Sequence, residues 1–448
     1  MEESRPSSLY GICVPGMTER PAVRYRLIDR QHCSPTSLDE QLPLDHPVRL
    51  IWDFVCQLDL GDFLRPCRAV QGHPGAPIWP PQLLFALWLY GFVDGTLSAR
   101  RLARLCRRDL PFQWLCGGDP VNYHTLADFY SQNEGPLRQL FVEHVAALLE
   151  QGLIGLQTVT LDGRKVPANA SKDHLHREPT LQAHLDQARA HLAELEAARE
   201  QEMRRGAARA AARRRGARER VQRLERALAV VRERQQQRRQ STRRDVLPED
   251  ARASETDPDA AKMKFPNGGY GLAYNVETVS DEATGLIVTV ALTNQGSDNG
   301  QLAPLLEQVR QEQGVLPERV LLDSGFADAA DVENLEKEGV EVLMPPKNER
   351  KEQAAGKDPY AAKRRDSAEL ATWRARMGTA EARTRYRRRA PVAEGVHAQQ
   401  SNRGWRRFRL RGRGKARGET CWQALAHNVA KLLRRGEFLR GTVRAEGV

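Results

Sequence analysis

The first third of the chain carries apolar residues at helical spacing. Segments with this period begin at Val48, Gln82, Ala99, Thr125 and Glu134. Ser98 is a suitable N-cap for the helix from Ala99, whose Leu side chains face inward and whose Arg side chains face outward. The pattern predicts an all-helical N-terminal domain over residues 48–152, preceded by an arm over residues 1–47. The Arg-rich helix is either a helix-turn-helix-like DNA contact or a solvated basic face.

Further along the chain the period changes to that of strands. Strand patterns cover residues 158–161, 270–279, 286–294, 320–322 and 340–345. Helical patterns from Leu302 and from Asp331 separate the last three of these strands. The order predicts an α/β fold, a mixed sheet with flanking helices, in a domain over residues 153–435. A C-terminal tail is expected over residues 436–448.

Between the first and second strands, apolar residues follow heptad spacing in two arms. They are Leu181, Leu185, Ala188, Leu192 and Leu195 in the first arm and Val221, Leu224, Leu228 and Val231 in the second. Such spacing is typical of coiled coils. Because Gly206 and Gly216 lie in the intervening stretch, we expect an antiparallel helical hairpin inserted into the sheet over residues 178–245. One continuous helix or a disordered middle also fits the pattern.

Two carboxylates follow two of the predicted strands. Asp162 and Gly163 interrupt the alternation of the first strand, and Asp323 follows the apolar run of a later one. We therefore expect each carboxylate at or just past a strand end, at the rim of the sheet. Each Asp alone is more simply explained as a turn residue, since Asp-Gly and Asp-Ser-Gly are common in turns.

Charge and cysteine content narrow the class of protein. The 448 residues carry a formal net charge of +11, which favours a polyanionic partner, although many ordinary proteins are basic. The seven cysteines include no Cys-x-x-Cys pair, which predicts neither a disulfide framework nor a zinc site. The longest apolar run, residues 83–90, is too short to span a bilayer, and no signal-peptide core is found. We expect a soluble intracellular protein.

Six blocks of sequence carry a resemblance to a known family. In order they are LLFALWLYGFVDGTLSARRLARLCRRD, TVTLDGRKVPANAS, TDPDAAKMK with YGLAYNVETVSD, NQGSDNGQLAPLLEQV, VLLDSGFADAADVENLEKEGVEVLMP, and YRRRAPVAEGVHAQQSNRGWRRFRLRGRGKARGE followed by ALAHNVAKLL. The chain resembles, over residues 45–435, a bacterial insertion-sequence transposase of the D-D-E type. The order of the blocks is more specific than any single block.

The resemblance implies a ribonuclease H-like catalytic domain with a three-acid site. Asp162, Asp323 and Glu394 would hold two Mg²⁺ ions, with Mn²⁺ as a substitute, and the enzyme would cut DNA and join its 3′ end to a target. The implied partner is double-stranded DNA, both terminal inverted repeats and target DNA, bound by a homodimer or higher oligomer. The helical N-terminal domain would bind DNA, and the protein would be cytoplasmic and nucleoid-associated, away from the membrane. Two-metal chemistry needs such hard oxygen ligands, with the cations about 3.5–4 Å apart.

The region around Glu394 is strongly basic. Residues 383–417 contain 13 Lys and Arg residues and a single acid, Glu394. A glutamate on a helix surface, paired with a neighbouring Arg, is the alternative to a metal ligand, and the resemblance favours the ligand. The candidate DNA-binding residues around it are Tyr386, Arg389, Arg403, Trp405, Arg406 and Arg407. Solvated side chains, or core anchors in the case of the aromatic residues, explain them equally well.

Three further observations qualify the resemblance. The family pattern implies a Lys seven residues after Glu394, where this chain has Ser401, so we expect slow cleavage of DNA ends. A catalytically degenerate transposase copy, or a basic coiled-coil DNA-binding protein without nuclease activity, therefore stays open. His174 and His176 have no third ligand at a recognisable zinc spacing, and we expect a surface pair. Asp257, Asp259 and Asp298 recur in the family blocks as possible structural acids.

Overall fold

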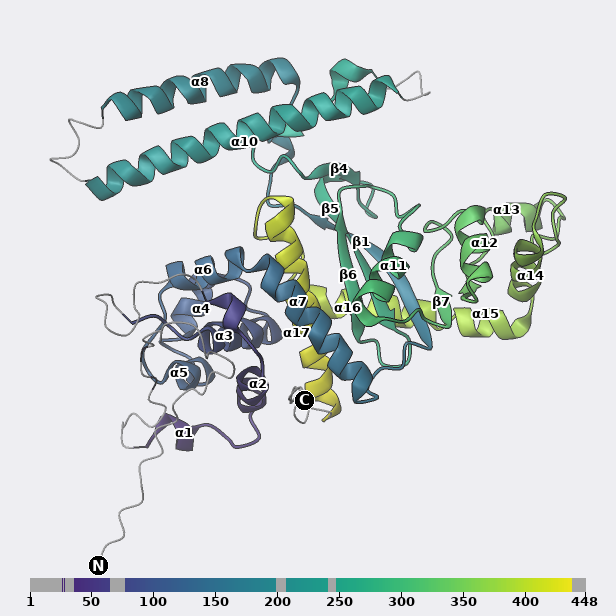
Figure 1. Ribbon diagram of the computed structural model, residues 1–448, viewed down its shortest axis with the longest axis horizontal. Helices are drawn as coiled ribbons and strands as arrows, with labels where there is room; N and C mark the ends of the chain where they lie inside the picture. Colours follow the sequence, from purple (N-terminus) through teal and green to yellow (C-terminus); the bar gives the residue numbers. More distant parts are fainter. Residues whose placement is uncertain are drawn as a thin grey trace, which may run out of the picture. The chain divides into compact units, whose positions relative to one another are not determined.

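The computed structural model describes residues 26, 28, 36–64, 77–198, 207–240 and 247–436. The chain divides into two compact units, one made of residues 1–139 with 428–448 and the other of residues 140–427. Figure 1 shows the elements of both. Most of the predicted N-terminal arm and nearly all of the predicted tail lie outside the described residues, as do Cys13, Cys33 and Cys67.

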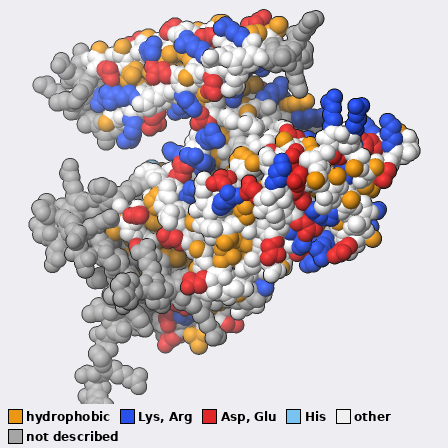
Figure 2. Space-filling model, turned by 45° about the vertical axis from the view of Figure 1, so that its right-hand side comes forward, with side chains coloured by type: hydrophobic (Ala, Val, Ile, Leu, Met, Phe, Trp, Pro, Cys, Tyr) orange, Lys and Arg blue, Asp and Glu red, His pale blue; other side chains and the backbone are white. Residues whose placement is uncertain are grey.

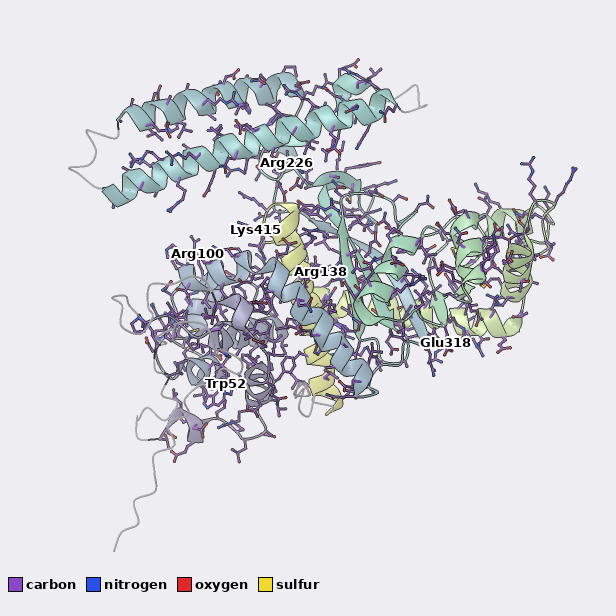
Figure 3. All side chains as sticks on the ribbon, in the orientation of Figure 1. Trp52, Arg100, Arg138, Arg226, Glu318 and Lys415 are labelled. Carbon is purple, nitrogen blue, oxygen red and sulfur yellow. The ribbon has the colours of Figure 1, made fainter. Side chains whose placement is uncertain are left out.

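The first unit is helical, as the apolar period predicts. Its elements are α1 (Leu38–Gln41), α2 (Pro47–Cys56), η1 (Gly61–Phe63), α3 (Pro81–Asp94), α4 (Ala99–Leu105), α5 (Leu110–Cys116), α6 (Tyr123–Gln132) and the first residues of α7 (Glu134–Glu150). Ser98 caps α4 by accepting the Arg101 N–H, which confirms the predicted start. The helix ends at Leu105, and α5 begins at Leu110 with a Pro in its first turn. Arg100 is exposed on α4 (Figure 3).

The second unit contains the predicted mixed sheet. Its strands are β1 (Thr158–Pro167), β4 (Ala261–Lys264), β5 (Tyr270–Asp281), β6 (Ile287–Thr293), β7 (Arg319–Leu321) and β8 (Glu341–Leu343). The strand order is β4-β5-β1-β7-β8, and β6 also pairs with β5. β5 runs antiparallel to β1, β4 and β6, whereas β7 runs parallel to both β1 and β8. Residues 272–281 of β5 are all buried, as expected of a central strand covered on both faces.

The first strand corrects the prediction that Asp162 lies at a strand end. β1 continues through Asp162 and Gly163 to Pro167, because β5 pairs with it along almost its whole length, from Val159 opposite Asp281 to Pro167 opposite Ala273. The Asp-Gly pair therefore makes no turn. On its other side β1 pairs with β7 only over residues 158–160. Asp162 thus lies within the pairing of β1 with β5 and just beyond the pairing of β1 with β7.

The insertion is a hairpin of two long helices, α8 (Glu178–Ala197) and α10 (Ala207–Arg239) (Figure 1). Their buried apolar residues form a core of their own. The helices are antiparallel, since residues early in α8 pair with residues late in α10. The ion pairs are Glu178 with Arg232, Arg189 with Glu225, and Glu196 with Arg218. Figure 2 shows Lys and Arg side chains mixed with Asp and Glu over the surface of the hairpin.

A short two-stranded sheet closes the base of the hairpin. β2 (Leu175–His176) precedes α8 and pairs antiparallel with β3 (Ala253–Ser254), which follows α10. The short helices η2 (Lys172–His174) and η3 (Pro248–Asp250) flank these strands. Arg226 of α10, labelled in Figure 3, donates two hydrogen bonds to Asp259 just beyond the base. The chain therefore enters and leaves the hairpin on two paired strands.

The remaining elements of the second unit flank the sheet or follow it. They are α11 (Leu302–Gln313), α12 (Ala329–Lys337), α13 (Glu349–Ala354), α14 (Ala368–Met377), α15 (Ala380–Tyr386), α16 (Arg389–Asn402) and the greater part of α17 (Arg413–Arg435). Helix α16 packs against β1. None of the helices within the described ranges combines the length and the apolar character that a membrane span requires.

Candidate active site

Asp162 and Asp323 occupy equivalent positions on neighbouring parallel strands. The last paired residues of β1 and β7 are Thr160 and Leu321. Each Asp lies two residues further on, where the two strands have separated. Asp323 is exposed and accepts the N–H of Gly325 at 3.3 Å. Both carboxylates therefore emerge at the same edge of the β1–β7 pair, although only Asp323 lies past the end of its strand.

Helix α16 contacts Asp162 through two side chains. Arg389, at the start of the helix, donates a hydrogen bond of 2.9 Å to Asp162 Oδ1. His397, two turns later, places Nε2 at 3.2 Å from Asp162 Oδ2. Arg389 and His397 each expose only 13% of their side chains, against 23% for Asp162. Asp162 is therefore held between the sheet and the inner face of α16.

Tyr386 connects the two aspartates indirectly. It ends α15, three residues before Arg389, and forms a side-chain hydrogen bond with Arg389. Burial raises the pKa of the Tyr386 phenol, the positive charge of Arg389 opposes this rise, and the negative charge of Asp323 adds to it. The charge of Asp323 thus acts on the Tyr386 phenol, while the phenol itself contacts Arg389, the ion-pair partner of Asp162.

Glu394 lies on the exposed side of α16, between Arg389 and His397. The helix-surface position of the alternative is thus observed, whereas within the described part of the chain the carboxylate makes no ion pair with a neighbouring Arg. The three acids are not closed into one cage. Among the described residues, the group of His, Cys, Asp and Glu side chains whose ligand atoms all lie within 4.8 Å of one another is a different one, His174, His176 and Glu255.

Two further carboxylates lie on the Gly163 face of β1, the face opposite to that of Asp162, and sequence reasoning missed one of them entirely. Glu277 lies on β5 directly opposite Gly163 of β1. The Asn275 amide donates one hydrogen bond to Glu277 at 2.6 Å and one to Asp298 at 2.5 Å, which draws these two acids together. Burial raises the pKa of Glu277 to about 8, and the negative charges of Asp298 and Asp162 contribute. Burial therefore favours the protonated, uncharged form of Glu277 near neutral pH.

Gly163 is required by this close approach. A Cβ at this position would lie 2.7 Å from both Asp298 Oδ1 and Glu277 Oε2. Any side chain would force one of the two acids away from β1. The glycine after Asp162 therefore serves packing against carboxylates and not a turn.

Arg164 stands beside Ser401, the position where the family resemblance implies a Lys. Its guanidinium donates hydrogen bonds of 2.9 Å to Ser401 Oγ and to the His397 carbonyl, and one of 2.5 Å to the Trp405 carbonyl. It also stacks on the Trp405 ring at 5.0 Å. Burial lowers the pKa of Arg164 to about 10. A positive charge thus lies next to Ser401 even though the expected Lys is missing.

The basic tract after α16 divides into buried and exposed residues. Trp405 is fully buried and its Nε1 donates to Glu419, while Arg403 is 8% exposed and lies 3.2 Å from the ring of His427. Both side chains are largely buried, and Trp405 lies where the alternative of a core anchor places it, so their role as DNA contacts stays a prediction. Arg406 and Arg407 are exposed and remain available to a phosphate.

Comparison with known families agrees with the resemblance in the sequence. The family described as "Transposase DDE domain" matches residues 248–429, and the family described as "Transposase domain (DUF772)" matches residues 36–132. The chain belongs to the DDE-type insertion-sequence transposases. The curated proteins and the solved structures that were compared with this transposase gave no match.

The two matches divide the transposase much as its fold does. The DUF772 match covers helices of the first unit, and the DDE match begins beyond the helical hairpin and includes Asp323 and Glu394. Asp162 precedes the hairpin and lies outside the match. A local signal existed for Arg164, which is two residues from Asp162 and so shares its face of β1. No local signal marked Glu277, since its place depends on the pairing of β5 with β1.

Proposed function

We propose that this transposase cuts DNA at the ends of an insertion sequence and joins the 3′ ends to target DNA, with Asp162, Asp323 and Glu394 as its metal-binding acids. The observation that carries the proposal is the equivalent position of the two aspartates beyond the last paired residues of β1 and β7. Helix α16, which carries Glu394, adds support because its Arg389 contacts Asp162 directly.

We further propose that the catalytic sheet is ribonuclease H-like. Three antiparallel strands, β6, β5 and β1, are followed by β7 and β8, which are parallel to β1. This is the strand arrangement expected of that fold. The domain is proposed to span residues 153–435 with the hairpin, residues 178–245, as an insertion, and residues 48–152 are proposed to bind DNA.

The residues around Asp162 fit a hard divalent cation, Mg²⁺ or in its place Mn²⁺. Carboxylate oxygens are the ligands that such ions prefer. The carboxylates of Asp162 and Asp323 emerge at the same edge of the β1–β7 pair, and that of Asp323 is exposed to solvent. When bound, a pair of such cations would activate the attacking oxygen and stabilise the leaving oxygen of a phosphodiester.

The chain's own residues would position the DNA end. Arg389 is already bound to Asp162, and its guanidinium and the Tyr386 hydroxyl are suited to a phosphate at the cut end. The exposed Arg406 and Arg407 would neutralise backbone charge further along the duplex. Terminal inverted repeats and target DNA are the proposed partners, bound by a homodimer or higher oligomer.

The experiment that tests the proposal measures nicking of labelled element ends with Mg²⁺ present. Asp162→Asn, Asp323→Asn and Glu394→Gln are each expected to abolish nicking while leaving DNA binding nearly unchanged, because affinity comes mainly from Lys and Arg. Glu318→Gln is the matched control, since this exposed acid precedes β7 at the end away from Asp323 (Figure 3).

The outcomes separate the two candidate functions. Nicking by Asp162→Asn at the wild-type rate would remove Asp162 from the site. If the wild type binds element ends and nicks none of them at any Mg²⁺ or Mn²⁺ concentration, the protein is a non-catalytic DNA-binding copy. The replacement of the expected Lys by Ser401 is the observation that favours this second function.

A further inference from the structure

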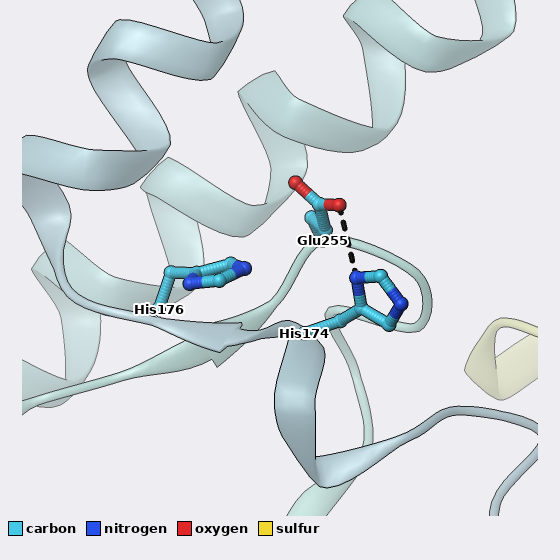
Figure 4. Close-up of side chains that lie close together, drawn as sticks. All are labelled: His174, His176 and Glu255. Carbon is cyan, nitrogen blue, oxygen red and sulfur yellow. Dashed lines mark hydrogen bonds and ion pairs between the residues drawn. The ribbon is translucent and has the colours of Figure 1, made fainter.

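A cluster of histidines lies at the base of the helical hairpin. It includes His174 and His176, which the sequence predicts to be a surface pair. His174 ends η2, His176 is in β2, and Glu255 follows β3. The ligand atoms of these three residues lie within 4.8 Å of one another (Figure 4). The fold therefore brings a third possible ligand to the two histidines, although none stands at a recognisable zinc spacing in the sequence. Glu255 is 81 positions from His174 in the sequence, so spacing gave no indication of it.

The distances within the cluster resemble those between ligands of one metal ion. His174 Nδ1 lies 3.2 Å from Glu255 Oε1. Ligand atoms around a tetrahedral Zn²⁺, with bonds of about 2.0–2.2 Å, are separated by roughly 3.3 Å. The rings of His174 and His176 have centroids 6.5 Å apart and are nearly perpendicular, which leaves room for an ion between their nitrogen atoms. Only small side-chain movements would be needed.

A further histidine fixes the carboxylate. His184, in α8, places Nδ1 at 2.8 Å from Glu255 Oε2, the oxygen that faces away from His174. A hydrogen bond from a neighbouring side chain to the second oxygen of a carboxylate orients it as a ligand. The His184 ring also packs against His176, with centroids 5.2 Å apart. One cluster therefore joins the strand that enters the hairpin, helix α8, and the strand that leaves it.

We propose that His174, His176 and Glu255 bind a Zn²⁺ ion that fastens the base of the hairpin, with His184 as the positioning residue for Glu255. Imidazole and carboxylate ligands suit Zn²⁺, and three protein ligands leave the fourth position to water. The side chain of His174 is 51% exposed and that of Glu255 20% exposed, so an ion can enter from solvent. The site is separate from the three acids proposed for catalysis.

The consequence for the fold is a fixed hairpin. The β2–β3 pairing joins only two residues of each strand, which is a weak connection for helices as long as α8 and α10. A metal that links His174 to Glu255 closes the whole inserted segment in a loop, and cross-links across long loops stabilise by restricting the unfolded chain. Binding of Zn²⁺ to the folded state alone would raise the thermal midpoint as the ion concentration exceeds its dissociation constant.

The test uses the full chain, stripped of metal with a chelator and titrated with Zn²⁺ against a chromophoric competitor. We expect one ion per chain at this site. His176→Gln and Glu255→Gln should each weaken zinc affinity by more than about tenfold, because replacing a residue that only orients a ligand already costs about that much. The matched control is His191→Gln, on the same helix α8 but with a side chain that is 62% exposed and lies near the exposed Glu194. Circular dichroism checks that each variant is folded.

Two measurements keep other zinc sites apart. Co²⁺ bound in place of Zn²⁺ should show the visible absorption of a tetrahedral site with nitrogen and oxygen ligands. It should show no thiolate-to-metal charge-transfer band, which would appear only if a cysteine were a ligand. Asp162→Asn should bind Zn²⁺ as the wild type does. The proposal is overturned if His176→Gln and Glu255→Gln bind like the wild type, if a thiolate band appears, or if Asp162→Asn abolishes binding.

Discussion

Glu277 gives this transposase an unusual dependence of stability on pH. Its carboxyl has an ordinary pKa near 4.5 in the unfolded chain and about 8 in the folded one, where it is buried beside Asp298 and Asp162. Between these values the folded state binds more protons than the unfolded state. Stability from this group is therefore complete below the unfolded pKa and is lost as pH rises toward the folded pKa. The loss approaches about 1.4 kcal/mol per pH unit, on the order of 3 kcal/mol between about pH 5 and pH 8.

Glu277→Gln removes this effect. The amide cannot ionise and keeps an oxygen to accept the hydrogen bond of the Asn275 amide, as Glu277 Oε1 does now. We expect the variant to be more stable than the wild type by on the order of 3 kcal/mol at about pH 8 and to match it near pH 5. Other titrating groups are common to both proteins and cancel in the difference.

The assay is urea denaturation of both proteins at several pH values between those limits. Glu318→Gln is the control, since this exposed acid should change neither the stability nor its pH dependence. Added Mg²⁺ should stabilise the wild type more than Glu277→Gln at the higher pH, because a cation near Asp162 offsets the same charge. A pH slope that is identical in the wild type and Glu277→Gln would show that Glu277 is not held protonated, and the reasoning from burial would fail.

Two other substitutions test the packing around β1. Gly163→Ala is expected to lower the free energy of unfolding by about 1–3 kcal/mol and to slow nicking, because its Cβ must displace Asp298 or Glu277. Gly155→Ala should leave stability unchanged, since nothing lies nearer than 3.9 Å to the added Cβ. Equal urea midpoints for the two variants would refute the close approach at Gly163. Ser401→Lys should lower the free energy of unfolding by about 1–3 kcal/mol, because the new ammonium would stand beside the Arg164 guanidinium. Like charges about 4 Å apart repel by up to about 4 kcal/mol at an effective dielectric of about 20. An equal loss of stability in the uncharged control Ser401→Gln would exclude charge repulsion as the cause.

Local periodicity predicted the long helices and the central strands of this protein, and it missed shorter elements such as α5, α14 and β4. The helical period placed α2, α3 and α7, the Ser98 cap placed the start of α4, and the heptad arms predicted the hairpin, whose antiparallel course the ion pairs then confirmed. These features depend on side chains a few positions apart, which the sequence displays directly. The same holds for Asp323, which follows a short apolar strand as expected.

The candidate site depended on strand register and on burial, which no local pattern contains. Asp162 lies inside β1 because β5 pairs along it, and that pairing also brings Glu277 opposite Gly163. Trp405 lies in a basic tract and has an aromatic ring that could stack on a base, yet the tertiary structure buries it beneath Arg164. The sequence by itself determined the strands β1, β5, β6, β7 and β8 and the helices with a clear apolar period, because those depend on neighbours in the chain. Only the tertiary structure decided which acids meet, which basic residues stay exposed, and that Glu255 joins two histidines, because these contacts form between segments far apart in the sequence.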